Sequence, residues 1–147
     1  MRVITRRINW ETKVSATESY VSMSNLTPKI QEHTAETYID NGTVTIFVPG
    51  TTAAITTIEW EKGLLEDFQD TWSRLVPRNL AYQHKFLWEE NNAFSHVRAS
   101  VLGQSLVVPV VNKRLTLGQF QQIVFVEFDN RARSRQVILQ FMGEQQM

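Results

Sequence analysis

Short runs of alternating hydrophobic and polar residues occur in both the N-terminal and the C-terminal parts of the chain. Such alternation is typical of strands that bury one face of a sheet. Two strands are predicted at the N-terminus, close enough in sequence to form a hairpin: Arg2–Trp10 and Ala16–Met23. Five more are predicted further along: Gly42–Val48, Ala53–Glu59, Ser105–Val111, Gln121–Asp129 and Ser134–Gly143.

Three other segments carry hydrophobic residues at the spacing of a helix. The first begins after Thr27, a good N-cap residue, and we expect it to stop at Asn41-Gly42. The other two predicted helices are residues 61–76 and residues 92–102. Residues 78–91 show no clear period and therefore predict a long loop.

The order of these elements indicates the fold class. Strands and helices intermix without a strict strand–helix alternation, so the sequence predicts an α+β fold. Its core would be a mixed or antiparallel, sandwich-like sheet with about three helices. The chain has 147 residues and no internal repeat or linker, so we expect residues 1–147 to form a single domain.

Composition narrows the range of partners. The chain has 15 Lys and Arg against 15 Asp and Glu, so its neutral formal charge argues against nucleic acid or an anionic membrane as a partner. It has no cysteine, which excludes disulfides and Cys-ligated metals and fits a reduced compartment. We expect a cytoplasmic protein, because the N-terminus lacks the apolar core of a signal peptide and no apolar run could cross a bilayer.

Two histidines are candidates for a reactive role. His84 falls on the predicted loop, and loops on a rigid scaffold often carry reactive groups. His96 falls near the start of the third predicted helix, where free N–H groups favour phosphate or carboxylate. The simpler alternatives stay open: a loop histidine bonded to backbone or water, and a half-buried histidine on an amphipathic helix.

An acidic residue, Glu127, lies within a strongly hydrophobic strand. A buried carboxylate there must be paired, metal-bound or protonated, whereas on an edge strand it would point to solvent. Gln121 lies six residues earlier and would point to the same face of a regular strand. The basic run that follows, Arg131–Arg135, is typical of a solvated turn, with a phosphate contact as the alternative.

Several motifs, taken in order, resemble one known family. They are VPGTTAAITTIEWEKGLLEDF, YQH, NNAFSHVRASVLGQSLVVPVV, RLTLGQFQQIVFVEFD and LQFMGE, within a likeness that runs from about Gly42 to Glu144. This succession is similar to that of the YjbQ-like family, whose members are generally described as secondary thiamine-phosphate synthases. The resemblance implies a compact α+β fold, a homotrimer, and a polar pocket close to the subunit contacts.

The resemblance also implies which residues form the site. His84, His96 and Glu127 match family positions and are the candidate catalytic residues. The two histidines are also candidate ligands for a divalent metal, Mg²⁺ or Zn²⁺. The candidate ligand-binding residues are two that also match family positions and three that add hydroxyl or cationic groups. They are Ser105 and Gln121, and Thr51, Thr52 and Arg98.

The sequence departs from the family pattern at two positions. Gly50 stands where the family usually has histidine, and Ile58 stands where it usually has asparagine. A three-histidine site would therefore be reduced to two, and a polar amide is replaced by an apolar side chain.

Two functions follow from the resemblance and its departures. The first is an enzyme that joins a pyrimidine methyl diphosphate to a thiazole phosphate and releases pyrophosphate. The alternative is a trimeric, non-catalytic or altered member that binds a small phosphorylated or heterocyclic ligand.

Overall fold

The computed structural model describes residues 1–15, 17, 19–84 and 91–145. Its larger sheet has five strands in the order β1-β8-β3-β5-β6. These strands are β1 (Arg2–Glu11), β3 (Ile39–Phe47), β5 (Ser105–Val111), β6 (Arg114–Leu115) and β8 (Ser134–Gln145). Every neighbouring pair is antiparallel, which confirms the α+β prediction with an antiparallel core.

A smaller sheet of three antiparallel strands has the order β2-β7-β4. Its strands are β2 (Ser22–Asn25), β4 (Ala53–Glu59) and β7 (Gln121–Glu127). The described helices are α1 (Thr27–Glu36), α2 (Lys62–Leu75) and α3 (Ala93–Leu102). Among the described residues, no helix combines the length and hydrophobicity needed to cross a membrane.

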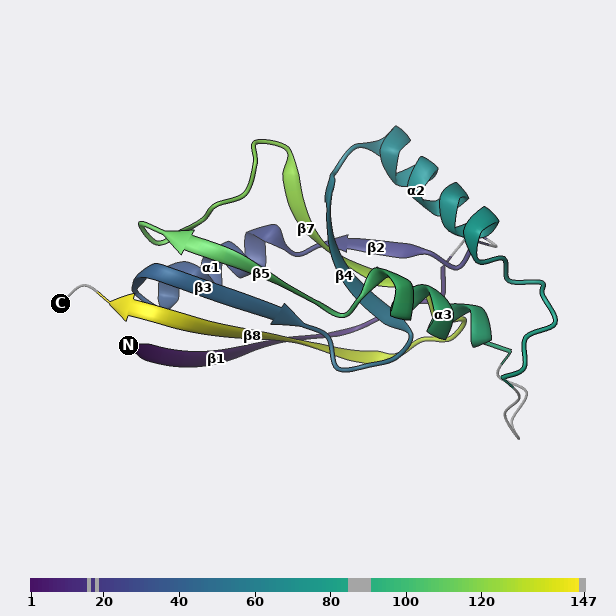
Figure 1. Cartoon of the computed structure of the whole chain (residues 1–147), viewed down its shortest axis with the longest axis horizontal. Coiled ribbons are helices and arrows are strands. Elements are labelled where there is room, and N and C mark those ends of the chain that lie inside the picture. Colours follow the sequence, from purple (N-terminus) through teal and green to yellow (C-terminus); the bar gives the residue numbers. More distant parts are fainter. Residues whose placement is uncertain (16, 18, 85–90, 146–147) are drawn as a thin grey trace.

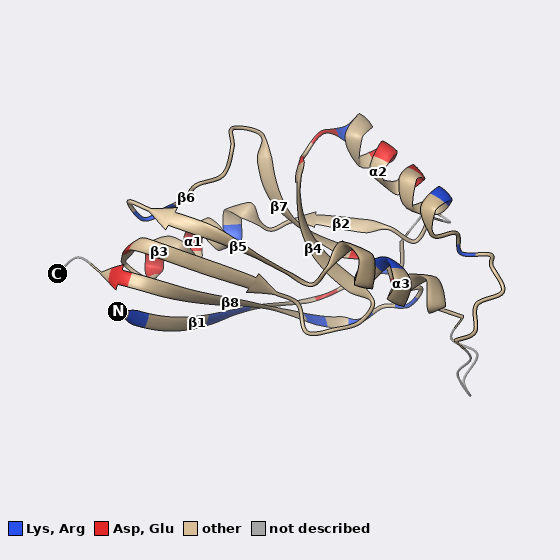
Figure 2. Cartoon of the chain, viewed as in Figure 1, with Lys and Arg blue, Asp and Glu red and all other residues tan. Residues whose placement is uncertain are grey.

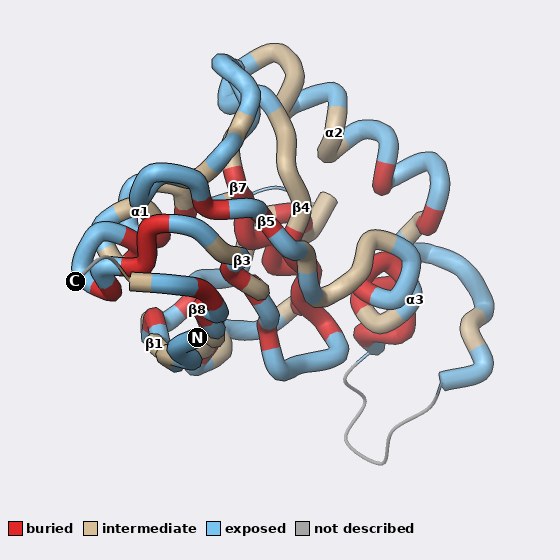
Figure 3. The backbone as a smooth tube through the Cα atoms, turned by 60° about the vertical axis from the view of Figure 1, so that its left-hand side comes forward, coloured by how far each residue is buried: buried red, intermediate tan, exposed pale blue. Residues whose placement is uncertain are grey.

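The two sheets and the helices α2 and α3 form layers, with the smaller sheet in the middle (Figure 1). One face of β7 gives Ile123 and Phe125 to a core shared with the larger sheet. The other face gives Val124 and Val126 to a second core under α2 and α3, and Phe128, just beyond the end of the strand, packs in the same core. This division confirms the predicted alternation, and Figure 3 shows buried residues along β4, β7 and α3.

The predicted N-terminal hairpin is wrong. β1 pairs with β8 along its whole length, while β2 pairs with β7 in the other sheet. The reason lies in their apolar residues, because Ile8 of β1 packs in the core between the sheets and Met23 of β2 packs against the core under the helices. β1 therefore belongs to the larger sheet and β2 to the smaller one.

The first helix is shorter than predicted. It ends at Glu36, and the hydroxyl of Thr37 donates to the Thr34 carbonyl just beyond it. Gly42 lies inside β3, where a Cβ atom would come within 2.0 Å of the Met142 carbonyl oxygen. The glycine therefore permits close approach of β3 and β8 and does not terminate a helix.

The outer face of α2 carries most of its charges, as Figure 2 shows. Its first turn is capped by Glu61, whose carboxylate accepts hydrogen bonds from the N–H groups of Gly63 and Leu64. Trp72 faces inward and meets Phe128 edge-on, with ring centroids 5.2 Å apart. An amphipathic helix of this kind covers one face of the small sheet and leaves its polar face to solvent.

Candidate functional site

Glu127 ends the central strand of the small sheet and is only 3% exposed. Both of its carboxylate oxygens accept hydrogen bonds from Arg135 of β8, at 2.8 Å from Nε and 2.6 Å from Nη2. The pair joins the two sheets at one end of the layered core. Burial raises the pKa of the Glu127 carboxyl, and the hydrogen bonds and charge of Arg135 oppose that shift.

Thr52 and Asp129 extend this ion pair into a network. The Thr52 hydroxyl accepts from Nη2 of Arg135 at 2.7 Å and donates to Oδ2 of Asp129 at 2.9 Å. Arg133 donates from Nε to the same oxygen at 2.8 Å. Burial alone would raise the pKa of Asp129, but the hydrogen bonds from Thr52, Arg133 and the Asn130 N–H hold it below its usual range.

A cavity of about 300 Å³ opens beside this network. We call it the ion-pair cavity. The β3–β4 turn, the start of α3 and the start of β8 meet there and contribute its lining: Gly50, Thr51, Thr52, Asn92, His96, Arg133, Ser134 and Arg135. These segments are brought together because β4 and β8 each lie in a sheet that the Glu127–Arg135 pair connects.

Asn92 supplies the most buried polar group of this cavity. Its side chain is 1% exposed, and its Nδ2 donates to Oδ1 of Asp129 at 3.4 Å. Its Oδ1 has no hydrogen-bond partner within the described part of the chain. Nearby, the Ser95 hydroxyl donates to the Phe128 carbonyl at 2.6 Å and fixes the first turn of α3 against the end of β7.

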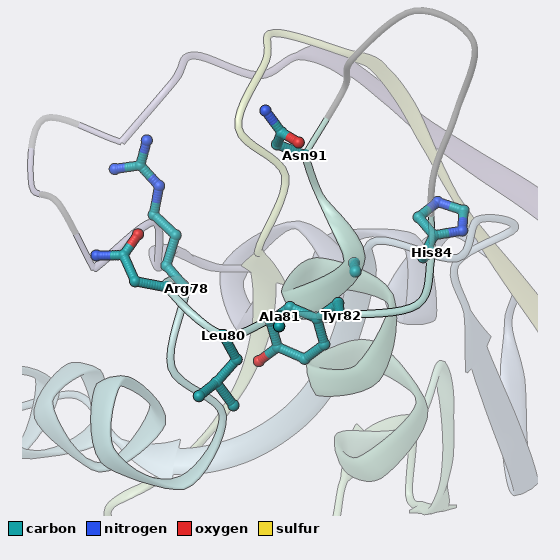
Figure 4. Close-up of a pocket in the computed structure, with 8 residues that line it drawn as sticks. Arg78, Leu80, Ala81, Tyr82, His84 and Asn91 are labelled. Carbon is teal, nitrogen blue, oxygen red and sulfur yellow. The ribbon is translucent and has the colours of Figure 1, made fainter.

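The two candidate histidines lie together. The rings of His84 and His96 meet edge-on with centroids 4.8 Å apart. His96 lines the ion-pair cavity, whereas His84 lines a second cavity of about 350 Å³. Figure 4 shows Arg78 and His84 at opposite ends of that second cavity, with Tyr82 between them. The histidine pair therefore lies between the two cavities.

Arg98 is held by backbone carbonyls. It is 1% exposed and donates to the carbonyls of Val76, Ser19, Tyr20 and Trp72. Two of these carbonyls belong to the C-terminal end of α2, where the helix dipole favours a cation. Burial lowers the pKa of Arg98 to about 10. The side chain thus fastens α3 to α2, and it does not line the ion-pair cavity.

Other candidates lie away from the ion-pair cavity. Gln121 is at the opposite end of β7 from Glu127, roughly 20 Å along the strand, and its amide bonds Gly118 and Thr57. Ser105 is exposed at the start of β5, paired with Phe47. Ile58 packs against the core under the helices. The structure brings together Thr51, Thr52, His84, His96 and Glu127, but not these residues.

The described residues contain no group of three or more His, Cys, Asp or Glu side chains placed to hold a metal ion. His84 and His96 provide two nitrogen donors close together. Two imidazoles alone are fewer than the three protein ligands of a typical catalytic zinc site. A metal at this pair would need further ligands from substrate or solvent.

Sequence reasoning missed Arg135, Arg133, Asp129 and Asn92 as parts of one arrangement. The signal was present in part, because the basic run at residues 131–135 follows directly on the acidic strand end that contains Glu127 and Asp129. A buried carboxylate at Glu127 needs a partner, and Arg135 is that partner. No local pattern shows that β8 turns this arginine inward.

Comparison with known proteins identifies the family. The model of the family described as UPF0047 protein YjbQ-like matches residues 11–144. A UPF0047 protein of Archaeoglobus fulgidus is 43% identical over 99 residues, which are 67% of this chain and 76% of that protein. One from Methanocaldococcus jannaschii is 30% identical over 145 residues, 98% of this chain and 99% of the other. The chain belongs to the YjbQ-like family.

Solved structures agree with the fold. A YbjQ-like protein of unknown function from Sulfolobus solfataricus superposes with a TM-score of 0.85 at 26% identity, covering 97% of this chain and 100% of that one. A hypothetical protein from Aeropyrum pernix gives 0.81 at 32% identity, covering 95% and 99%.

Proposed function

We propose that this protein binds a small phosphorylated ligand in the ion-pair cavity. The observation that carries the proposal is the buried Glu127–Arg135 pair on the wall of a cavity of about 300 Å³. A buried ion pair is a weak source of stability compared with apolar packing, so its presence at a cavity favours a role in recognition. Arg133 adds a second cation, and a cavity of this size is at the lower end of those that hold small molecules.

A catalytic role is a second candidate, supported by the histidine pair. Glu127 has both oxygens bonded to Arg135, so it serves poorly as a general base and acts by orienting the arginine. His96, with His84 beside it, is the residue placed to move a proton at the cavity. In a thiamine-phosphate synthase reaction, the thiazole nitrogen would attack the pyrimidine methylene carbon as pyrophosphate leaves with Mg²⁺.

The enzymatic assignment has a direct test. The purified protein is incubated with the pyrimidine methyl diphosphate, the thiazole phosphate and Mg²⁺, and thiamine phosphate is measured. Activity above a boiled control that falls at least tenfold in His96→Asn would support the assignment. No product above the boiled control would remove it and leave ligand binding as the function.

Metal binding is tested separately by zinc titration with elemental analysis. We propose that glycine at position 50, where the family usually has histidine, leaves the metal site with two histidines in place of three. The parent should therefore bind Zn²⁺ weakly. Stoichiometric, tight binding by the parent would contradict a reduced site. Histidine at position 50 would have to displace Arg135, because a Cβ there lies 2.9 Å from its Nη1.

We also propose that the protein works as a cytoplasmic homotrimer without a nucleic-acid partner. The outer face of the larger sheet supports self-association, because it exposes several apolar side chains: Val3, Phe47, Val107, Val111 and Met142. Such a patch on a small protein favours a protein contact. Sedimentation equilibrium should give three times the chain mass of 17.0 kDa, and a monomer would contradict the proposal.

A further inference from the structure

Arg135 is held so that one end of its guanidinium is fixed and the other is available. Nε and Nη2 bond Glu127, and Nη2 also bonds Thr52. Nη1, the remaining nitrogen of the guanidinium, donates to neither Glu127 nor Thr52. The residue is 8% exposed and lines the ion-pair cavity. A guanidinium locked on one side presents its remaining N–H groups at low entropic cost, which suits an oxyanion.

Gly50 lies directly against this available nitrogen. A Cβ atom at position 50 would be 2.9 Å from Nη1 of Arg135, and the next atom it would meet is the guanidinium carbon at 4.0 Å. Gly50 has no positive φ, so alanine would fit its backbone. The glycine is therefore required for the space beside Nη1.

Asn92 provides a group of opposite hydrogen-bonding character in the same cavity. Because the carboxylate of Asp129 accepts hydrogen bonds, it faces the amide nitrogen of Asn92 and directs Oδ1 elsewhere. That oxygen is buried and has no partner within the described ranges. A buried acceptor without a donor is costly, and a ligand hydroxyl or amino group would satisfy it.

We infer that the ion-pair cavity selects a ligand that carries both an oxyanion and a hydroxyl or amino donor. Nη1 of Arg135 binds the oxyanion, Oδ1 of Asn92 accepts from the donor, and Gly50 keeps the approach to Nη1 open. The inference rests on the proposed ligand-binding function and defines its ligand class. A phosphate or a carboxylate could supply the oxyanion, so both are included in the test.

The ligand arm of the test uses calorimetry with three compounds: glycerol 3-phosphate, propyl phosphate and glycerate. Glycerol 3-phosphate has an oxyanion and donors, propyl phosphate lacks hydroxyl donors, and glycerate replaces phosphate with carboxylate. The expected result is that glycerol 3-phosphate or glycerate binds roughly tenfold or more tightly than propyl phosphate. Equal binding of all three would overturn the role of Asn92.

The protein arm uses Gly50→Ala, because removal of Arg135 would leave Glu127 buried without its counter-charge. The matched control is Gly118→Ala, whose Cβ would meet nothing closer than 3.5 Å and lies outside the cavity lining. Gly50→Ala should weaken the tightest ligand roughly tenfold or more. Gly118→Ala should leave its affinity unchanged, and circular dichroism should show both variants folded.

The outcomes separate the inference from the function on which it rests. If the parent binds one of these ligands and Gly50→Ala binds it equally well, the roles of Gly50 and Arg135 are overturned while ligand binding stands. If the parent binds none of the three at millimolar concentration, both are overturned.

Discussion

Asp129 shows how one buried carboxylate makes stability depend on pH. Its folded pKa lies below the ordinary value, so the folded state holds its proton less tightly than the unfolded chain. The resulting stability is present above the unfolded pKa of about 3.9 and is lost as pH falls through the folded pKa. Glu127 has the opposite shift, so it lowers stability as pH rises above the unfolded value of its pKa, about 4.3.

We therefore expect Asp129→Asn to flatten the acid side of the stability profile. Urea unfolding would be measured between about pH 3 and pH 7. The free energy of unfolding of the parent should fall more steeply below about pH 4 than that of the variant. A parallel acid limb in both proteins would show that Asp129 does not contribute this dependence.

Arg98 makes a structural contribution that sequence alone cannot distinguish from phosphate binding. It bonds four backbone carbonyls, so truncation leaves several buried acceptors unsatisfied. Arg98→Met should lower the free energy of unfolding by about 3 kcal/mol. The matched control is Arg74→Met on the exposed side of α2, which should change it by less than about 0.5 kcal/mol. Equal effects of the two substitutions would refute this role.

At the scale of elements, the contact between β3 and β8 depends on two facing glycines. Gly42 pairs with Gly143, and a Cβ on either would lie within 2.4 Å of a backbone oxygen. Gly42→Ala should therefore destabilise the fold by at least about 2 kcal/mol in urea unfolding. Gly118→Ala is again the control, and an unchanged midpoint for Gly42→Ala would contradict the close approach.

The helices and strands were largely predictable, because hydrophobic periodicity and helix capping are properties of the local sequence. Ala53–Glu59 and Ser105–Val111 match the predicted strands, and α3 lies between its predicted limits at Asn92 and Gly103. Strand partners were not predictable in the same way, because the pairing of β1 with β8 depends on which core each strand faces. The inward turn of Arg135 has the same origin, since its buried carboxylate partner, Glu127, belongs to the other sheet.

At the scale of the whole molecule, β7 belongs to both cores and should couple them. Trp10 contacts Phe125 on one face of β7, while Trp72 contacts Phe128 just beyond its end on the other. We expect one cooperative unfolding transition, as small single domains usually show. Two variants would be made, one whose only tryptophan is Trp10 and one whose only tryptophan is Trp72. In each variant, the urea midpoint from tryptophan fluorescence should equal the midpoint from circular dichroism. A fluorescence midpoint that differs from the circular-dichroism midpoint of the same variant would indicate independent cores.

Gly50 bears both on the resemblance to the family and on the geometry of the ion-pair cavity, which it lines. Where the resemblance leads one to expect a histidine, the structure has a glycine against Arg135, with Thr52, Asp129 and Asn92 around it. The nitrogen that lies beside this turn is Nη1 of Arg135, which comes from β8. A guanidinium at this position favours binding of an oxyanion over binding of a metal.

We propose that the ion-pair cavity binds a small anionic ligand through Arg135. The most direct measurement is a nuclear magnetic resonance titration with glycerol 3-phosphate, following backbone amides and the arginine Nε–H signals. We predict saturating shifts for Gly50, Thr52, His96 and the Arg135 side chain. Saturating shifts confined to Arg78 and Tyr82 at the second cavity, or no saturating shift at all, would contradict the account.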